Sequence, residues 1–524
     1  MCGTLVSGWL LVASPLEESP AVAAARAYAE ALAPFGFRGA VLAERAGAEE
    51  LALGIGEVGA GGAAVTPDTL FDLGSNSTCY TAAAALLLVD RGEWTLDDAL
   101  PALLGDGVEV PPEKRAITLR QLLSHSAGLD HSGHFSGDFE AVARDEAIRR
   151  ILARPLLYAP GRGSSYSDAG YILTAALPAA EFAGGRVDGI EQGSGRKFGA
   201  PTFAILGAGG MVASVRDVAT FLRAVRAGEL LSDEQATAFE SPQHRLGPQQ
   251  AEGFGFVIAT QGARTVRQSA GGTPQLGHNA LLSWSQPDDL LLVIHTADAG
   301  WRGEDLGPRL RALLEGRAVP PPPALAPRDD VALARTAGKF ALQGGGNVEL
   351  TATRGALELR ALDAEGFTAL HGSAGGDAAG ARNGLDRVFT QRVDAGIEAW
   401  RARRAVELGP EKGVTLLGHA TVDGGSEPWA FVRVDFERGS SISRFVFGPR
   451  GSVEALVLNA TLPALRLWPL RDGTFAPFSL GTPPGLTALR IAGDDASAAI
   501  GASESAELAL EFTAGRKLVA RRSR

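Results

Sequence analysis

The chain has 524 residues and a formal net charge of -11, with 45% hydrophobic and 21% charged residues. This length exceeds what one hydrophobic core fills, so two or more domains are expected. The acidic balance argues against nucleic acid or an anionic membrane surface as the main partner. Two cysteines, Cys2 and Cys79, are too few for a disulfide framework, and we expect two unpaired thiols.

The N-terminal segment has an apolar run over residues 5–13, which is the length of a signal-peptide core. No Lys or Arg precedes this run, because the first basic residue is Arg26. No apolar stretch is long enough for a transmembrane helix. We expect residues 1–21 to form a leader or an N-terminal extension, and the protein to be periplasmic or extracellular, with a cytoplasmic location as the alternative.

The first part of the chain mixes helical and strand patterns, which predicts an α+β architecture. Ser75, Asn76 and Ser77 offer N-cap side chains for an Ala/Leu-rich helix. The predicted elements are two strands over residues 38–58, helices over 75–90, 119–124 and 214–227, two strands over 281–294 and a closing helix over 306–314.

A proline-rich segment separates this part from the rest of the chain. Residues 319–323 and Pro327 predict a stiff spacer, so we expect a first domain over residues 22–317, a linker over 318–332 and a β-rich accessory domain over 333–524. One helix, over residues 385–400, interrupts the strands of the accessory domain. Its predicted strands are 348–352, 356–362, 414–419, 430–436, 443–447, 453–459, 465–470, 508–512 and 517–521.

The segment 71–75 (FDLGS) places Ser75 at the entrance of the helix 75–90. A serine there gains from the helix dipole, and its backbone N–H can help to hold a developing oxyanion. A single serine at a helix start is usually only a cap. Ordered neighbouring motifs change that interpretation.

Six segments in order resemble the serine β-lactamase and penicillin-recognising family, which includes class C β-lactamases, D-alanyl-D-alanine carboxypeptidases and related esterases. The resemblance covers residues 35–317 and implies an antiparallel sheet flanked by helices, with acyl transfer through an ester on Ser75. The segments are 65–75 (VTPDTLFDLGS), 88–98 (LVDRGEWTLDD), 117–129 (ITLRQLLSHSAGL), 160–171 (PGRGSSYSDAGY), 209–214 (GGMVAS) and 271–274 (GGTP).

The resemblance assigns catalytic positions to Ser75, Thr78, Tyr166 and Asp168. The family uses Ser-x-x-Lys, in which an amine one helical turn after the serine takes the serine proton. Thr78 stands at the Lys position and Asp168 stands where the Tyr-x-Asn motif has its carboxamide. A neutral hydroxyl cannot act as the base, and a phenol with an ordinary pKa of about 10 is a poor substitute at neutral pH.

The family's third motif, Lys-Thr-Gly or His-x-Gly, corresponds here to Ser269, Ala270 and Gly271. We therefore expect Ser269, Gly271 and Gly272 to line the substrate site, although Ser269 brings no basic group. The oxyanion hole needs only backbone N–H groups, which the resemblance assigns to Ser75 and Gly272.

Histidines and Cys79 have structural interpretations. His125 lies inside the third motif and is expected to be a hydrogen-bonded structural residue. His131 and His134 lack a third ligand for zinc, so no metal site is expected. His278 is either a surface loop residue or a replacement base, and Cys79 is expected to pack rather than to react.

We therefore predict a serine hydrolase-fold protein, impaired because the general base is lost, that requires no cofactor. Its partner would be a small-molecule or peptide acyl substrate. Two alternatives stay open: an active esterase or peptidase with Tyr166 as the base, and a non-catalytic protein that binds a ligand or the cell envelope.

Overall fold

The computed structural model describes residues 18–58, 62–131, 135, 140–177, 202–273, 277–298, 300–371, 378–392, 395–421, 428–447, 453–460, 462–480, 486–492 and 507–523. The chain forms two compact units, Met1–Pro321 and Pro322–Arg524. The division between them falls in the predicted linker. Among the described residues, no helix has the length and apolar character that a membrane crossing requires. The predicted leader core, His134 and Pro274 lie outside the described residues.

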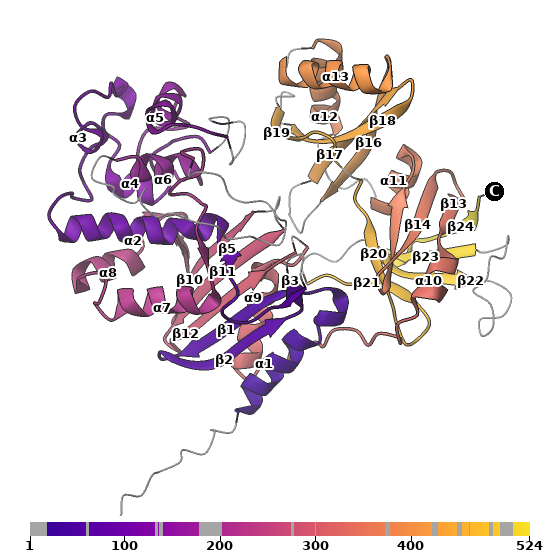
Figure 1. The fold of residues 1–524 in the computed structure, drawn as a ribbon, viewed down its shortest axis with the longest axis horizontal. Helices are drawn as coiled ribbons and strands as arrows, with labels where there is room; N and C mark the ends of the chain where they lie inside the picture. Colours follow the sequence, from indigo (N-terminus) through magenta and orange to yellow (C-terminus); the bar gives the residue numbers. More distant parts are fainter. Residues whose placement is uncertain are drawn as a thin grey trace, which may run out of the picture. The chain divides into compact units, whose positions relative to one another are not determined.

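The first unit is built on an eight-stranded antiparallel sheet in the order β2-β1-β12-β11-β10-β9-β8-β7 (Figure 1). Short strand pairs β3–β4 and β5–β6 lie apart from this sheet. The strands are β1 Gly39–Arg45, β2 Ala48–Ile55, β3 Glu57–Val58, β4 Ala63–Ala64, β5 Phe71–Asp72, β6 Val212–Ala213, β7 His244–Arg245, β8 Gln250–Glu252, β9 Val257–Gln261, β10 Arg264–Thr273, β11 His278–Gln286 and β12 Leu290–Thr296.

Helices cover both faces of the central strands. Leu281 and Ile294 contact α9, whereas Leu282 and Val293, which point the other way, belong to the main core with α2. Every residue of β12 is buried, as a strand covered on both faces requires. The helices are α1 Pro20–Glu30, α2 Ser77–Asp90, α3 Leu100–Leu104, α4 Leu119–Leu123, α5 Arg144–Ala153, α6 Asp168–Ala175, α7 Val215–Arg226, α8 Asp233–Glu240 and α9 Gly303–Leu314, with 3₁₀ turns η1 Ala33–Phe35, η2 Gly74–Asn76 and η3 Pro112–Lys114.

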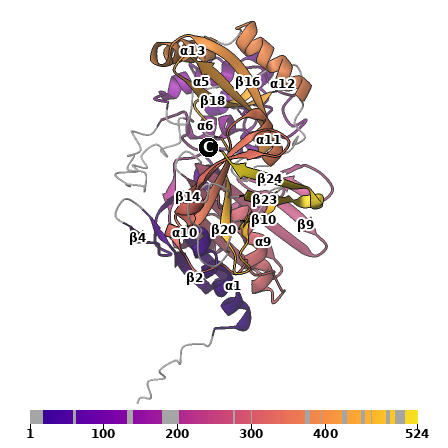
Figure 2. The same cartoon turned by 90° about the vertical axis from the view of Figure 1, so that its right-hand side faces the viewer.

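The second unit contains a closed barrel in the order β13-β14-β15-β20-β21-β22-β23-β24. Four of its strands, β14, β20, β23 and β24, are labelled in Figure 2. Its first and last strands close it, since Phe340 pairs with Arg522. A four-stranded sheet, β16-β17-β18-β19, is inserted between β15 and β20. The strands are β13 Gly338–Leu342, β14 Asn347–Thr353, β15 Ala356–Ala361, β16 Glu411–Thr421, β17 Pro428–Phe436, β18 Gly439–Phe447, β19 Val453–Val457, β20 Leu465–Pro469, β21 Phe475–Pro477, β22 Leu486–Ala492, β23 Glu507–Phe512 and β24 Lys517–Arg522.

The single helix predicted over residues 385–400 is wrong. The structure has α12 Ala378–Leu385, a π-helical turn Asp386–Thr390 and then α13 Ala395–Leu408. Arg392, between these helical segments, has a φ of +55°, a left-handed conformation that a right-handed helix cannot continue. The apolar side chains that suggested one helix still share a core, because Phe389 and Trp400 both pack against β17 and β18.

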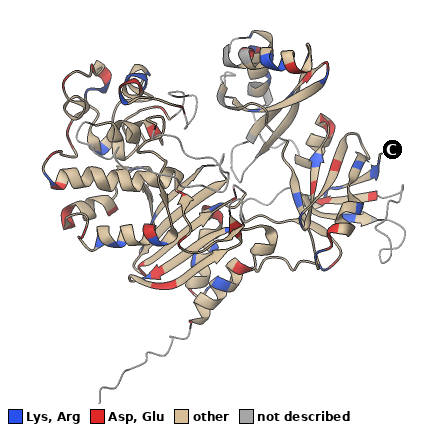
Figure 3. Ribbon diagram, in the orientation of Figure 1, with Lys and Arg blue, Asp and Glu red and all other residues tan. Residues whose placement is uncertain are grey.

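Two further helices of the second unit were not expected. α10 Asp330–Thr336 begins inside the predicted linker, where the Asp329 side chain caps it by accepting a hydrogen bond from the Ala332 N–H at 2.9 Å. α11 Ala364–His371 follows β15. Acidic and basic residues are interspersed along the elements of each unit (Figure 3).

Candidate functional site

Ser75 lies on the tight 3₁₀ turn that joins β5 to α2, just before the helix rather than at its first residue. The turn is fixed by Asp72, whose Oδ1 accepts a hydrogen bond from the Gly74 N–H at 2.6 Å. Gly74 has a φ of +50°, which favours glycine. The expected side-chain cap of α2 does not form, since the Ser77 hydroxyl instead accepts from the Met211 N–H at 3.2 Å.

The C-terminal part of β10, which contains Gly271 and Gly272, lies directly against this turn. A Cβ atom at Gly271 would stand 2.2 Å from the Leu73 carbonyl oxygen and 2.7 Å from the Ser75 nitrogen, so no side chain fits there. A Cβ atom at Gly74 would stand 2.3 Å from the Gly272 nitrogen. The structure therefore brings Gly271 and Gly272 together with the Ser75 turn, as the predicted oxyanion hole requires.

Thr78 is 2% exposed and lies in the first turn of α2. Its hydroxyl donates a hydrogen bond to the backbone carbonyl of Ser75 at 2.7 Å. This is a local bond within the helical turn, of the kind that Ser and Thr side chains often form. The Thr78 hydroxyl therefore donates its proton to the backbone of Ser75 and not to the Ser75 side chain.

Ser269 is buried on β10 beside the thiol of Cys79. Burial raises the pKa of the Cys79 thiol to about 12, and a hydrogen bond with Ser269 lowers it in part. The thiol donates to the Gly255 carbonyl oxygen at 3.1 Å. Cys79 is therefore packed as expected, and its burial and raised pKa disfavour the thiolate that a nucleophile requires at neutral pH. Substrate binding by Ser269 stays a prediction.

Tyr166 and Asp168 form a pair at the start of α6. The Tyr166 hydroxyl donates to Asp168 Oδ1 at 2.8 Å, and the Tyr166 residue is 40% exposed. Asp168 is the first residue of α6, where the helix dipole favours a carboxylate. On its other side, Asp168 Oδ2 lies 3.7 Å from His131 Nδ1. A proton relay would depend on the Tyr166 hydroxyl, and the proton of this hydroxyl is donated to the Asp168 carboxylate.

Two histidines flank the Tyr166 ring, with ring centroids at 4.7 Å for His125 and 5.1 Å for His131. His125 is buried and its Nδ1 accepts from the Ser167 N–H at 3.2 Å, which fixes the neutral tautomer. Burial lowers the pKa of His125 to about 4. The structural interpretation of His125 is confirmed.

Neither interpretation of His278 is right. It is not on a surface loop, because it is buried on β11. It is also not a replacement base, because its Nδ1 accepts from the Asp72 N–H at 3.1 Å and burial lowers its pKa to about 4. His278 instead holds β5 in place beneath the Ser75 turn.

Glu252, at the end of β8, was missed by the sequence interpretation. It is 8% exposed, and its Oε1 accepts from the Ser164 hydroxyl at 3.2 Å. Burial raises the pKa of Glu252 to about 7, and the bond with Ser164 opposes this rise. No periodic pattern marks a single glutamate, so only the tertiary structure connects it with the segment that carries Tyr166.

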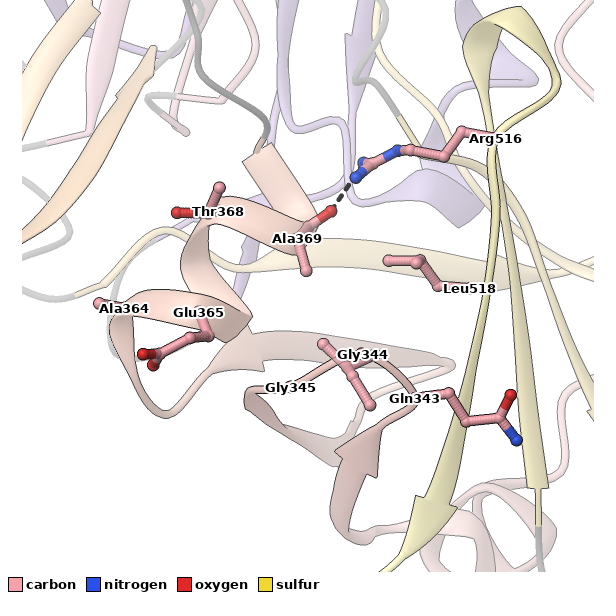
Figure 4. A pocket seen from close by; sticks show the side chains of 10 residues that line it. Gln343, Gly344, Gly345, Ala364, Glu365, Thr368, Ala369, Arg516 and Leu518 are labelled. Carbon is pink, nitrogen blue, oxygen red and sulfur yellow. Dashed lines mark hydrogen bonds between the residues drawn. The ribbon is translucent and has the colours of Figure 1, made fainter.

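The described residues contain no group of three or more His, Cys, Asp or Glu side chains that could hold a metal ion. The second unit has a separate pocket of about 430 Å³ between the β13–β14 turn, α11 and β24 (Figure 4). Within it, Arg516 donates to the Ala369 carbonyl oxygen at 2.7 Å. Ser75 and its neighbours have no part in this pocket.

Comparison with known proteins gives one family. Residues 25–184 match the family model described as Beta-lactamase. Esterase EstB of Burkholderia gladioli is 36% identical over 130 residues, which is 21% of this chain and 32% of that protein. Penicillin-binding protein 4 of Amycolatopsis lactamdurans is 39% identical over 109 residues, which is 20% of this chain and 26% of that protein.

Among solved structures, the octameric penicillin-binding protein homologue from Pyrococcus abyssi is similar over 95% of this chain and 99% of that chain, at 15% identity and a TM-score of 0.47. The chain spans about a third or less of the length of the two curated relatives, at 32% and 26%. The matched segment contains both Ser75 and Tyr166. The first unit therefore contains a segment of the Beta-lactamase family over residues 25–184, and this segment is similar to an esterase and a penicillin-binding protein.

Proposed function

We propose that the first unit binds an ester or amide acyl donor and forms an acyl-enzyme at Ser75, slowly, because the standard activation of the serine is impaired. The observation that carries this proposal is the hydrogen bond from the Thr78 hydroxyl to the Ser75 carbonyl oxygen, 2.7 Å long. Where the family motif has an amine that takes the serine proton, this chain has a neutral donor directed at the backbone.

The expected loss of catalytic rate is large but incomplete. General base assistance contributes roughly 100- to 10,000-fold to such reactions. Stabilisation of the oxyanion depends on backbone N–H groups, and the close packing of Gly271 and Gly272 on the Ser75 turn supports that part of the mechanism. We therefore expect the first unit to be a slow acyl transferase or hydrolase and not an inert scaffold.

An active esterase or peptidase with Tyr166 as the base is the second candidate. The 40% exposure of the Tyr166 residue and the 2.8 Å bond from its hydroxyl to Asp168 favour it. In that mechanism, Tyr166 would take the Ser75 proton while Asp168 accepts the phenol proton. The difficulty is that an ordinary carboxyl, with a pKa of about 3.9, is a much weaker base than a phenolate.

Labelling with a fluorophosphonate and with a fluorescent penicillin tests the proposal. Wild type should label slowly, and Ser75→Ala should not label. Thr78→Lys, alone and with Ser269→His, should raise the labelling rate by up to about 100- to 10,000-fold. Thr220→Lys, which adds the same amine at an exposed position of α7, is the matched control and should leave the rate unchanged.

Two outcomes overturn the proposal. Rapid Ser75-dependent labelling that Tyr166→Phe abolishes would instead establish the tyrosine mechanism. No labelling of wild type, together with no gain in Thr78→Lys, would leave a protein that only binds its ligand or the cell envelope.

The substrate and the location follow as proposals. The names of the relatives, an esterase and a penicillin-binding protein, support an ester or an amide of a small molecule or peptide as the acyl donor. We also propose export to the periplasm or the medium, which cell fractionation tests; recovery in the cytoplasm alone would exclude it.

A further inference from the structure

Glu252 lies between the two segments that carry Ser75 and Tyr166. After β8, the Gly253 N–H donates to the Phe256 carbonyl oxygen at 2.7 Å, which closes a tight turn into β9. Within that turn, the Gly255 carbonyl oxygen accepts from the thiol of Cys79, one helical turn after Ser75. The turn that follows Glu252 is therefore seated against the start of α2.

On its other side, Glu252 holds residues 164–168, which we name the Tyr166 loop. Its Oε1 accepts from the Ser164 hydroxyl at 3.2 Å. His125 holds the same loop further along, since its carbonyl oxygen accepts from the Ser165 N–H at 3.1 Å and its Nδ1 accepts from the Ser167 N–H. Glu252 thus attaches the start of this loop, while its later part is attached by His125 and by the Asp130 carbonyl oxygen, which accepts from the Ser167 hydroxyl at 3.0 Å.

Among these attachments, the bond to Glu252 is the one whose acceptor, the Glu252 carboxyl, is expected to change its ionisation state near neutral pH. The Glu252 residue is 8% exposed, and within the described ranges no cationic group is near enough to favour its ionised form. Burial raises its pKa to about 7. His125 stays neutral across this range, because burial lowers its pKa to about 4.

The other titratable groups near Glu252 are phenols. Burial raises the pKa of Tyr158 and of Tyr171, and the nearby Glu252 carboxylate raises both further. These phenols therefore keep their protons at neutral pH. Within the Tyr166 loop, Asp168 accepts from the Tyr166 hydroxyl, and His131 lies near both the Asp168 carboxylate and the Tyr166 ring, so His131 is the group that the experiment must control.

We propose that Glu252 is a positioning residue, which holds the Tyr166 loop through Ser164 and holds it more firmly when its carboxyl is ionised. A hydroxyl bonded to a carboxylate makes a shorter and stronger hydrogen bond than one bonded to a neutral carboxyl. The inference rests on the proposed function in one respect: it assumes that Ser75 and Tyr166 serve one site.

The test compares the pH dependence of Ser75 labelling by a fluorophosphonate between pH 5.5 and 8.5. All variants carry His131→Asn, so that His131 cannot contribute a titration. The labelling rate should rise by up to about ten-fold through neutral pH while Glu252 and Ser164 are present. Glu252→Gln and Ser164→Ala should each flatten this rise, and the double variant should behave like either single variant.

A second readout separates the inference from the proposed function. The ring signal of Tyr166 in ¹³C-tyrosine NMR, identified by its loss in Tyr166→Phe, should move through neutral pH and should stop moving in Glu252→Gln. If no labelling occurs but this signal titrates with Glu252, the proposed function fails and the positioning role stands. If the signal and the rate titrate unchanged in Glu252→Gln and in Ser164→Ala, the positioning role is overturned.

Discussion

The free energy of unfolding of the Glu252→Gln variant, relative to that of wild type, should increase as the pH rises from acid to alkaline. The cause is the burial of a carboxyl that raises its pKa from an ordinary 4.5 to about 7. A folded-state pKa above the unfolded value means that the unfolded chain ionises first as the pH rises. The stability contributed by Glu252 is therefore complete below pH 4.5, falls between 4.5 and 7 and is lost above 7.

The size of the effect follows from the same shift. Each pH unit between the two pKa values is worth about 1.4 kcal/mol, so the difference between Glu252→Gln and wild type should grow by about 3 kcal/mol between pH 4 and pH 8. Glutamine cannot ionise and its carbonyl oxygen can still accept from Ser164, so the variant should lack this pH dependence.

The assay is urea unfolding followed by the reactivity of the Cys79 thiol, in a Cys2→Ser background. Cys79 is buried in the first unit, so its exposure reports on that unit alone. Glu234→Gln, at an exposed position of α8, is the matched control and should follow wild type at every pH. A difference between Glu252→Gln and wild type that is constant from pH 4 to 8, or that shrinks towards alkaline pH, would refute the reasoning.

Three further predictions concern packing and pairing. Gly271→Ala should destabilise the first unit by about 1–3 kcal/mol and slow Ser75 labelling, because the new methyl group meets backbone atoms at 2.2 Å; urea unfolding and labelling rates measure both. Arg401→Met should lower the thermal stability of the second unit by about 2 kcal/mol, because it removes the close ion pairs with Glu411 and Glu398 and leaves Glu398 its 3.6 Å contact with Arg392. Cys79 should not react with a thiol reagent at pH 8 in the folded protein and should react fully after denaturation.

Gly247→Ala, with no atom within 4 Å of the new methyl group, should be close to neutral, and equal effects at both glycines would contradict the packing argument. Arg403→Met, at an exposed position of α13, should change the melting temperature little; a loss as large as that at Arg401 would contradict the pairing argument. Cys2→Ser isolates the signal of Cys79, and rapid modification in the folded state would contradict its burial.

Much of the first unit could be predicted because its signals are local. The continuous apolar run of β12 and the helix that follows Ser214 both read directly from the sequence. The ordered motifs placed Ser75 beside Gly271 and Gly272, and the structure brings these residues together. The exact start of α2 was missed, since the 3₁₀ turn depends on the bond between Asp72 and Gly74.

The features that escaped prediction depend on contacts between distant residues. His278 looked like a loop residue until its bond to Asp72 placed it under the Ser75 turn. Glu252 carries no motif, and its raised pKa arises from burial that only the folded chain creates. The barrel of the second unit is closed by residues more than a hundred positions apart, for which alternation along single strands gives no partner.

The pairing of β13 with β24 also sets an order of events during synthesis. A ribosome that has just released β13 must still make the four strands of the inserted sheet and the rest of the barrel before β24 can pair with Phe340. The inserted strands β16 to β18 are joined as consecutive hairpins, so they can fold early, while the edge of β13 waits unpaired. Slowing translation ahead of Lys517 should therefore prolong the interval in which this edge can recruit a foreign strand or a chaperone.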